Sequence, residues 1–218
     1  MFLLLAALQG CNPSNTAFSG HSISEFFPLH GVKRDAVYKN DDASFTEKML
    51  VEKLSETELS DGTDVSTLEH YLESSTGRTL IGTVEWSSET SDGVRIHGYS
   101  DGDGASTAFD PPVAISPSTD KWQTDDDPVC TETGGFTFRS ELIGFEDCPV
   151  AWGPDWSDCL HVALVGCSSD CECEEDESGL LFVGEYWQVS TYGTAWKQDA
   201  DKTVDQKWNL LSIEIAQE

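Results

Sequence analysis

The feature that most constrains the fold of this chain is a series of short apolar and aromatic segments separated by turns rich in glycine, aspartate and serine. Residues 80–86 and 94–99 flank a turn at 90–93, which is the pattern of a β-hairpin. Further segments of this kind lie at residues 136–145, 159–165, 180–189, 194–197 and 208–215. Their regular spacing predicts an all-β fold, either an antiparallel curled sheet, an open barrel or a sandwich, with at most one short helix.

Two segments are less regular than the others. In residues 46–59 the spacing of the apolar side chains would also suit a short helix. Residues 109–117 contain Pro111, Pro112 and Pro117, and a segment with prolines is not expected to be a central strand because proline donates no ladder hydrogen bond. We therefore expect the junction between two halves of one domain there.

The chain begins with a short apolar run at residues 2–7 that leads into Leu8-Gln9-Gly10-Cys11. Such a run is too short to span a bilayer and is typical of a secretory signal. The ending Leu-x-Gly-Cys resembles a bacterial lipobox, which implies cleavage after Gly10 and a diacylglycerol on Cys11. The alternatives are an ordinary signal peptide or a buried N-terminal strand.

The lipobox resemblance implies a domain organisation and a location. Residues 1–10 would be a lipoprotein signal peptide, residues 11–24 a lipidated cysteine with a flexible polar tether, and residues 25–218 a single β domain. The mature protein would then be anchored through its lipid in the bacterial cell envelope, at the outer membrane or the cell surface.

Six further cysteines are confined to a segment at residues 130–173. An even number of cysteines in an exported chain predicts disulfides. If residues 136–145 and 159–165 pair as a hairpin, Cys148 and Cys159 face each other at its mouth and are expected to bond. The same register brings Cys130 near the three later cysteines, one of which we expect as its partner, while the last two partners stay open. These later cysteines are Cys167, Cys171 and Cys173.

The charge of the chain narrows the choice of partners. Forty acidic residues against 12 basic ones give a formal net charge of -28. A field of this sign repels nucleic acid and anionic lipid, so we expect no nucleic-acid partner. Solubility in a saline medium explains the acidity better than charge-driven binding does.

No segment has the full pattern of a metal site, and we expect no metal and no cofactor. The acidic run at residues 170–177 lacks the glycine bend and alternating ligands of a calcium loop, and is expected to be a solvated loop. Residues 101–104 imitate the start of such a loop, but Pro112 stands where its final glutamate belongs, so we expect a β-turn. The three cysteines at residues 167–173 could bind zinc, although an oxidising location favours disulfides.

Catalysis is not expected, because the sequence has none of the common catalytic patterns. The five histidines are scattered, and neither a nucleophile elbow nor a phosphate-binding glycine loop is present. His97 and His161 lie in expected strands and are interpreted as packing or surface residues. Trp152 and Trp156 flank Gly153-Pro154 in a loop between cysteines, where they could contact a sugar ring or a partner protein, or pack in the core.

A family resemblance covers residues 26–215. The opening Phe26-Phe27-Pro28-Leu29 is similar to the Tyr-x-Pro-Leu start of TapB-like bacterial envelope lipoproteins, and residues 184–197 resemble their aromatic strand and following turn. Pro111-Pro112, with Trp122, falls where such chains cross between their halves. The resemblance implies an envelope lipoprotein and brings no established activity.

We therefore expect a non-catalytic envelope lipoprotein that binds or scaffolds, with an envelope protein or an apolar small molecule as its partner. This role predicts a filled core and an exposed patch. One alternative, a carrier of an apolar or lipidic ligand, predicts an apolar cavity on the concave face of a curled sheet. The other, an acid-base hydrolase, predicts two carboxyl groups roughly 5 to 10 Å apart in one cleft.

Overall fold

The computed structural model describes an all-β protein, as the spacing of the apolar segments predicts. The described residues are 23–27, 32–40, 49–59, 64–89, 93–116, 126–146, 159–167, 171, 183–189, 193–199 and 207–217. They form one 3-10 turn, η1 (Ile23–Phe26), and the strands β1 (Val32–Asn40), β2 (Met49–Glu58), β3 (Asp64–Ser74), β4 (Gly77–Glu89), β5 (Gly93–Asp101), β6 (Ser106–Ala114), β7 (Val129–Thr133), β8 (Phe136–Glu146), β9 (Cys159–Cys167), β10 (Gly184–Val189), β11 (Gly193–Asp199) and β12 (Lys207–Gln217).

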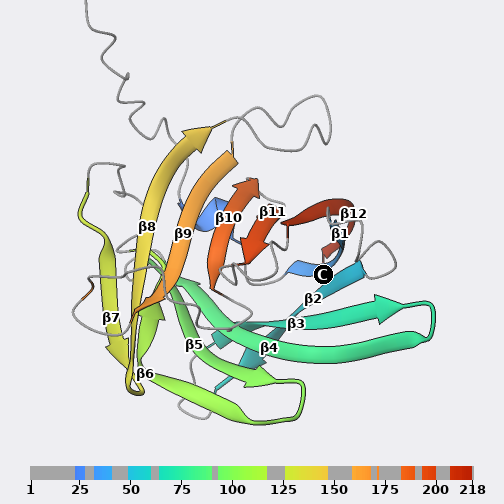
Figure 1. Ribbon diagram of the computed structural model, residues 1–218, viewed down its shortest axis with the longest axis horizontal. Helices are drawn as coiled ribbons and strands as arrows, with labels where there is room; N and C mark the ends of the chain where they lie inside the picture. The colour runs from blue at the N-terminus through green and yellow to red at the C-terminus, as the bar shows by residue number, and fades with distance from the viewer. Residues whose placement is uncertain are drawn as a thin grey trace, which may run out of the picture.

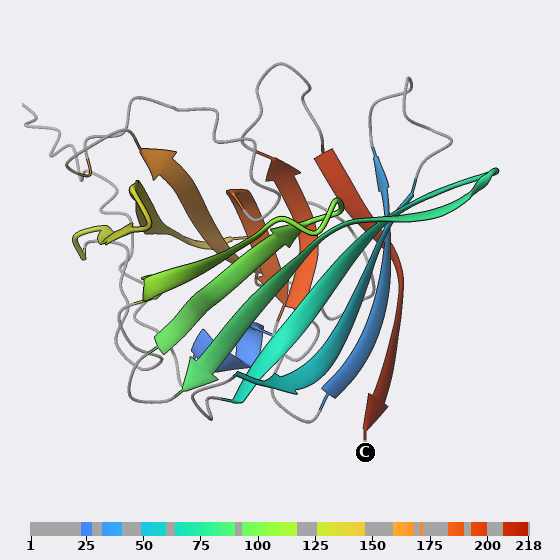
Figure 2. The same cartoon turned by 90° about the horizontal axis from the view of Figure 1, so that it is seen from below.

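All strands belong to one antiparallel sheet in the order β6-β5-β4-β3-β2-β1-β12-β11-β10-β9-β8-β7. The chain runs from the middle of the sheet to one edge, crosses to the other edge between β6 and β7, and returns until β12 pairs with β1. Figures 1 and 2 show that the sheet is strongly twisted and curled, so that its two edges approach each other.

Side-chain hydrogen bonds join the two edges of the sheet. The backbone N–H of Ala114 donates to Thr131 Oγ1 (3.0 Å), and Ser140 Oγ donates to the carbonyl of Ile115 (2.6 Å). No backbone ladder joins β6 to β7 within the part of the chain that the structure describes, so the sheet is curled but not closed.

The two irregular segments of the sequence are both strands. Residues 49–58 form β2, which pairs along its length with β3 and, over residues 49–54, with β1; this pairing on both sides decides against a helix. Pro111 and Pro112 lie in β6, which is an edge strand. The expectation that this segment is not central is confirmed, and the chain crosses between its two halves directly after it.

The hairpin expected around residues 90–93 is confirmed as β4 and β5, with Trp86 opposite Ile96 and Glu89 opposite Gly93. Gly93 has a positive φ of 75°, a conformation that glycine adopts without steric cost. A Cβ at this position would collide with the backbone carbonyl of Ser116. Glycine therefore lets the chain after β6 pass close to the start of β5.

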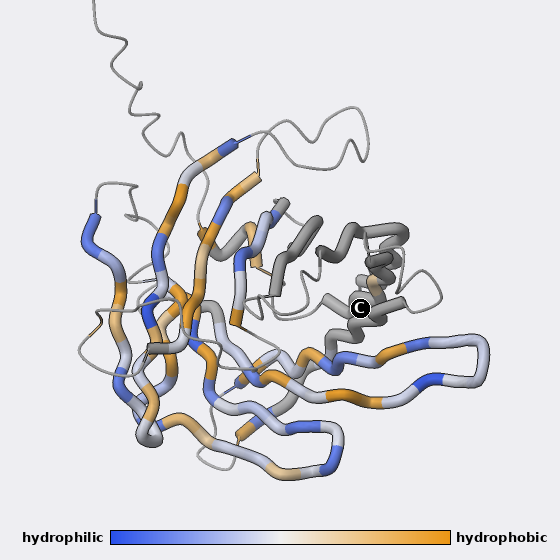
Figure 3. The backbone as a smooth tube through the Cα atoms, viewed as in Figure 1, coloured by the Kyte–Doolittle hydropathy of each residue, from blue (hydrophilic) through white to orange (hydrophobic). Residues whose placement is uncertain are grey.

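The core lies inside the curl and draws side chains from both halves of the sheet. Figure 3 shows hydrophobic and hydrophilic residues alternating along the coloured strands, such as β4, β5, β8 and β9, a pattern that places one face of each strand inward. Phe109 of β6 packs edge-to-face on Phe138 of β8, with ring centroids 5.6 Å apart. Phe26 at the end of η1 packs edge-to-face on Phe145 of β8, and the next residue, Phe27, packs in the same way on Trp86 of β4. The turn is thereby joined to both halves of the sheet.

One disulfide joins Cys130 in β7 to Cys171, with the two Cα atoms 6.0 Å apart. Cys171 is one of the three cysteines among which the sequence places the partner of Cys130. Cys159 is also disulfide-bonded, and β8 pairs with β9 so that Glu146 stands opposite Cys159. Cys148, the partner expected from the sequence, lies outside the described residues, as do Cys11 and Cys173. Among the residues described, no helix has the length and apolar character needed to cross a membrane.

Candidate functional site

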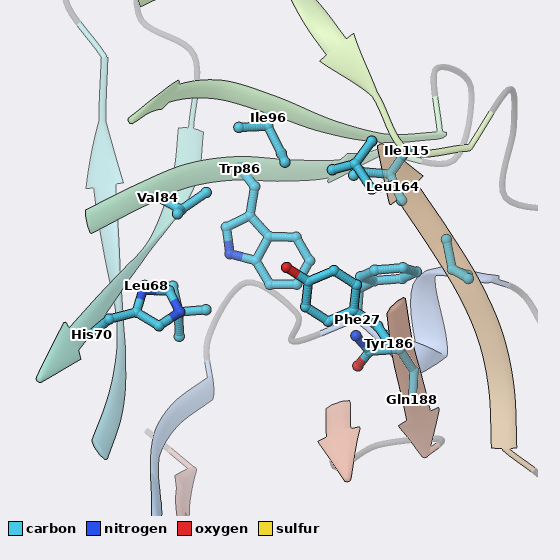
Figure 4. Close-up of a pocket in the computed structure, with 11 residues that line it drawn as sticks. Phe27, Leu68, His70, Val84, Trp86, Ile96, Ile115, Leu164, Tyr186 and Gln188 are labelled. Carbon is cyan, nitrogen blue, oxygen red and sulfur yellow. The ribbon is translucent and has the colours of Figure 1, made fainter. Parts of the chain in front are cut away.

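An apolar cavity of about 70 Å³ lies inside the curl, partly open to the exterior. Figure 4 shows the side chains that surround it. The lining residues are Phe27, Leu68, His70, Val84, Trp86, Ile96, Ile115, Val162, Leu164, Tyr186 and Gln188. Because one water needs only on the order of 10 Å³, this space is large enough for more than one heavy atom of a ligand.

Two distant parts of the chain build the cavity walls. One wall comes from β3, β4 and β5, where Leu68 stands opposite Val84 on the neighbouring strand. The other comes from β9 and β10, where Val162 stands opposite Tyr186. On β3, β4, β9 and β10 the two lining residues are two positions apart, which places them on the same face of the sheet. Phe27, next to η1, lies between the two walls.

A few polar groups interrupt the apolar wall. His70 and Gln188 are each 3% exposed, so the curl shields both from solvent. Trp86 is 8% exposed, and its indole N–H is buried with no hydrogen-bond partner among the described residues. The lining contains no carboxylate, lysine or arginine as far as it is described. The cavity therefore suits a neutral, mainly apolar molecule.

A second group of polar side chains lies on the opposite face of β9 and β10. His161 is 7% exposed and stacks on Trp187, with ring centroids 3.8 Å apart and an interplanar angle of 21°. Its Nδ1 contacts a carboxylate oxygen of Glu146, and its Nε2 lies 3.2 Å from a carboxylate oxygen of Glu185. The hydrogen bond from His161 lowers the pKa of Glu185 below its usual value.

The His161 group joins three neighbouring strands and does not reach the cavity. Glu146, His161 and Glu185 belong to β8, β9 and β10, so each contact crosses between adjacent strands. His161 and Glu185 alternate with Val162 and Tyr186, which line the cavity from the other face. We therefore assign the group a structural role in this half of the sheet; the sequence interpretation left open whether His161 is a packing or a surface residue, and the structure buries it.

The turn at residues 101–104 has the geometry expected from the sequence. The N–H of Gly104 donates to the carbonyl of Asp101 (3.1 Å), which is the hydrogen bond of a β-turn. The Asp101 carboxylate accepts hydrogen bonds from the N–H groups of Asp103 (3.0 Å) and Ala105 (2.9 Å). Within the described ranges, no cluster of three or more histidine, cysteine, aspartate or glutamate residues could hold a metal ion.

Most of the remaining residues that the sequence singles out lie outside the described residues. Trp152, Trp156 and Cys11 lie outside the described residues, and of the acidic run only Cys171 is described. His97 lies in β5, where its Nε2 is 2.7 Å from Ser87 Oγ.

The cavity was not located from the sequence, although part of its signal is visible there. His70 and Gln188 each lie two positions from another lining residue, Leu68 and Tyr186. Polar residues at positions that face the core indicate a hydrated or functional face of the sheet. Which strands face one another across the curl depends on long-range pairing, and local alternation does not encode it.

Comparison with known proteins identifies no relative: no family model, no curated protein and no solved structure matches this chain. The resemblances to a lipobox and to TapB-like lipoproteins accordingly stay predictions.

Proposed function

We propose that this protein binds a small, neutral and mainly apolar molecule in the cavity inside its curled sheet, without chemical conversion. The observation that carries the proposal is the apolar wall contributed by β3–β5 and β9–β10. Of the three functions considered from the sequence, the carrier is the one that requires an apolar cavity on the concave face.

The cavity favours a ligand for a simple physical reason. Apolar side chains that border an empty space lack contact atoms on one side and lose dispersion energy. A ligand that fills the space restores these contacts and leaves water, so apolar cavities take up small apolar molecules. Leu68, Ile96 and Leu164 offer such surface from both walls.

Charge supports a neutral ligand. The formal net charge of -28 repels anions at a distance. Inside, the described lining offers no cationic side chain to pair with an anion and no carboxylate to pair with a cation. A buried charge without a partner is costly, so charged molecules are disfavoured.

We also propose that a lipid on Cys11 anchors the protein in a bacterial envelope, on the strength of Leu8-Gln9-Gly10-Cys11 alone. Radiolabelled palmitate should enter the wild-type protein, and Cys11→Ser should abolish labelling and change the cell fraction that contains the protein. An unlabelled protein that stays in the same fraction after this substitution contradicts the anchor and leaves the cavity proposal untouched.

The binding proposal is tested by titrating isotope-labelled, oxidised protein with methylenecyclohexane and following backbone amide resonances by NMR. We expect saturable shifts centred on Val84, Ile96, Val162 and Leu164. Shifts that do not saturate, or that spread over the outer face, contradict the proposal.

A pair of variants separates the cavity from the surface. Leu68 lines the cavity and is only partly buried, so Leu68→Trp should fill the space and lower the affinity at least about tenfold. Ile143 is 45% exposed on β8, and Ile143→Trp adds the same bulk to the surface. This control should bind like the wild type. Equal affinity in both variants would show that the ligand binds elsewhere.

A further inference from the structure

The indole N–H of Trp86 lies in the cavity wall and has no hydrogen-bond acceptor among the residues that the structure describes. Trp86 is 8% exposed, and its Nε1 is buried. Buried polar groups in folded proteins nearly always have a partner, and a group without one calls for an explanation. A ligand that supplies the missing acceptor is such an explanation.

We propose that the indole N–H of Trp86 donates a hydrogen bond to the bound ligand, so that the cavity selects apolar molecules with an accepting oxygen over hydrocarbons of the same shape. This inference rests on the proposed function and names the ligand class: neutral compounds with a carbonyl, ester or ether oxygen.

The surroundings of Trp86 fix the direction of its N–H group. Trp86 lies in β4, with Ser66 of β3 opposite on one side and Ile96 of β5 opposite on the other. Phe27 packs edge-to-face on the indole, with ring centroids 5.5 Å apart. In Figure 4 the nitrogen lies on the edge of the ring directed toward Leu68 and His70. A donor held in this way needs no reorganisation when the ligand arrives.

The chemistry of the wall excludes the stronger acceptors. Carboxylates and phosphates accept hydrogen bonds well, but the described lining has no lysine or arginine to balance their charge. A neutral oxygen can accept the indole N–H without bringing an uncompensated charge into the cavity. Most of the ligand must stay apolar, because the rest of the wall is built from side chains such as Val84, Ile96 and Val162.

The inference is tested with cyclohexanone and methylenecyclohexane, two molecules of nearly identical shape. Cyclohexanone has a carbonyl oxygen where methylenecyclohexane has a CH₂ group. Dissociation constants for both are measured by NMR titration of the full chain, in the wild type and in Trp86→Phe. We expect the dissociation constant of methylenecyclohexane, divided by that of cyclohexanone, to be about tenfold smaller in Trp86→Phe than in the wild type. The reason is that this variant keeps an aromatic side chain but loses the hydrogen-bond donor. Comparing ratios cancels any change in cavity shape that affects both ligands.

Trp187→Phe provides the matched control. Trp187 is equally buried, at 8% exposure, but stacks on His161 on the opposite face of the sheet, so its loss should leave the ratio unchanged. If both ligands bind but Trp86→Phe leaves the ratio of their dissociation constants unchanged, the inference is wrong and the proposed function still holds. If neither ligand binds the wild type, the proposed function itself is wrong.

A measurement on the unaltered protein covers the case in which Trp86→Phe does not fold. The proton resonance of the Trp86 indole N–H should move downfield on saturation with cyclohexanone and stay nearly in place with methylenecyclohexane. Neither ligand is aromatic, so ring currents from the ligand cannot produce the difference. Equal movement with both ligands overturns the inference.

Discussion

Removing the disulfide between Cys130 and Cys171 should destabilise the protein strongly while leaving its packing nearly unchanged. The bond connects residues 41 positions apart and ties β7, the last strand of the sheet, to the segment beyond β9. Cys130 is exposed and Cys171 only partly buried, so serine at both positions loses little buried surface. The double variant Cys130→Ser/Cys171→Ser therefore reports mainly on the covalent link.

The magnitude follows from the length of the closed loop. In the chain-entropy model a loop of this size lowers the entropy of the unfolded chain enough to contribute about 4 kcal/mol at 25 °C. Because the dependence on length is logarithmic, the expected bond between Cys148 and Cys159, which would shorten this loop, would change the value only slightly. The loss is a large part of the total stability of a typical domain.

Urea unfolding of the oxidised proteins, followed by far-UV circular dichroism, measures this loss. The free energy of unfolding of the double variant should be lower by about 3 to 4 kcal/mol. Cys130→Ala/Cys171→Ala should give the same result, because the effect does not depend on the replacing side chain. A loss below about 1 kcal/mol in both variants would refute the reasoning.

Three further predictions concern the core, a turn and one ion pair. Phe138→Ala should lower the free energy of unfolding in urea by about 3 to 5 kcal/mol, since Phe138 is 1% exposed; a loss under 1 kcal/mol contradicts its place in the core. Gly93→Ala should cost more than about 1 kcal/mol, because the new Cβ meets the Ser116 carbonyl at a positive φ, and an unchanged urea midpoint would count against this turn. The pKa of Glu185 is lower in the folded protein than in the unfolded chain, so its carboxylate stabilises the fold at any pH above the unfolded pKa. This stabilisation is lost as the pH falls through the pKa of the folded state. The free energy of unfolding of the wild type should therefore exceed that of Glu185→Gln at pH 6, by less than about 1 kcal/mol because the carboxylate is half exposed. The difference should shrink as the pH falls below the unfolded pKa of glutamate, about 4.3. A difference independent of pH argues against the contact with His161.

Local patterns in the sequence were sufficient for several of the strands and for two pairs of neighbouring strands. The β4–β5 hairpin follows from alternating segments around the turn that ends at Gly93, and β8 pairs with β9 as their spacing suggests. The edge position of β6 follows from Pro111 and Pro112, which cannot donate to a second ladder. In each case the decisive interactions lie close together in the chain.

The arrangement of the whole sheet is not encoded locally. β1 and β12 pair although Val32 and Gln217 stand at opposite ends of the domain, and no short-range pattern predicts such a contact. For β2 the local spacing of apolar residues even suited a helix, and pairing with two neighbours decided its conformation. Long-range pairing also determines which faces meet across the curl, and therefore where the cavity forms.

The candidate site was predictable only in outline. The carrier alternative anticipated an apolar cavity on the concave face, but the ligand contacts expected from the sequence were Trp152 and Trp156, which are outside the described residues. Trp86 lies in the segment 80–86 expected to be a strand and was not among these expected contacts. The role that we propose for Trp86 depends on an Nε1 without an acceptor among the described residues, and the pairing of an indole nitrogen is visible only in three dimensions.

The most direct test of the apolar cavity is a crystal structure of the protein under xenon pressure. Xenon is apolar and fills dry cavities of this kind. We predict a xenon atom in van der Waals contact with Leu68, Ile96 and Leu164, between the two walls of the sheet. Side chains or ordered waters filling this space, with xenon absent from it, would contradict the account.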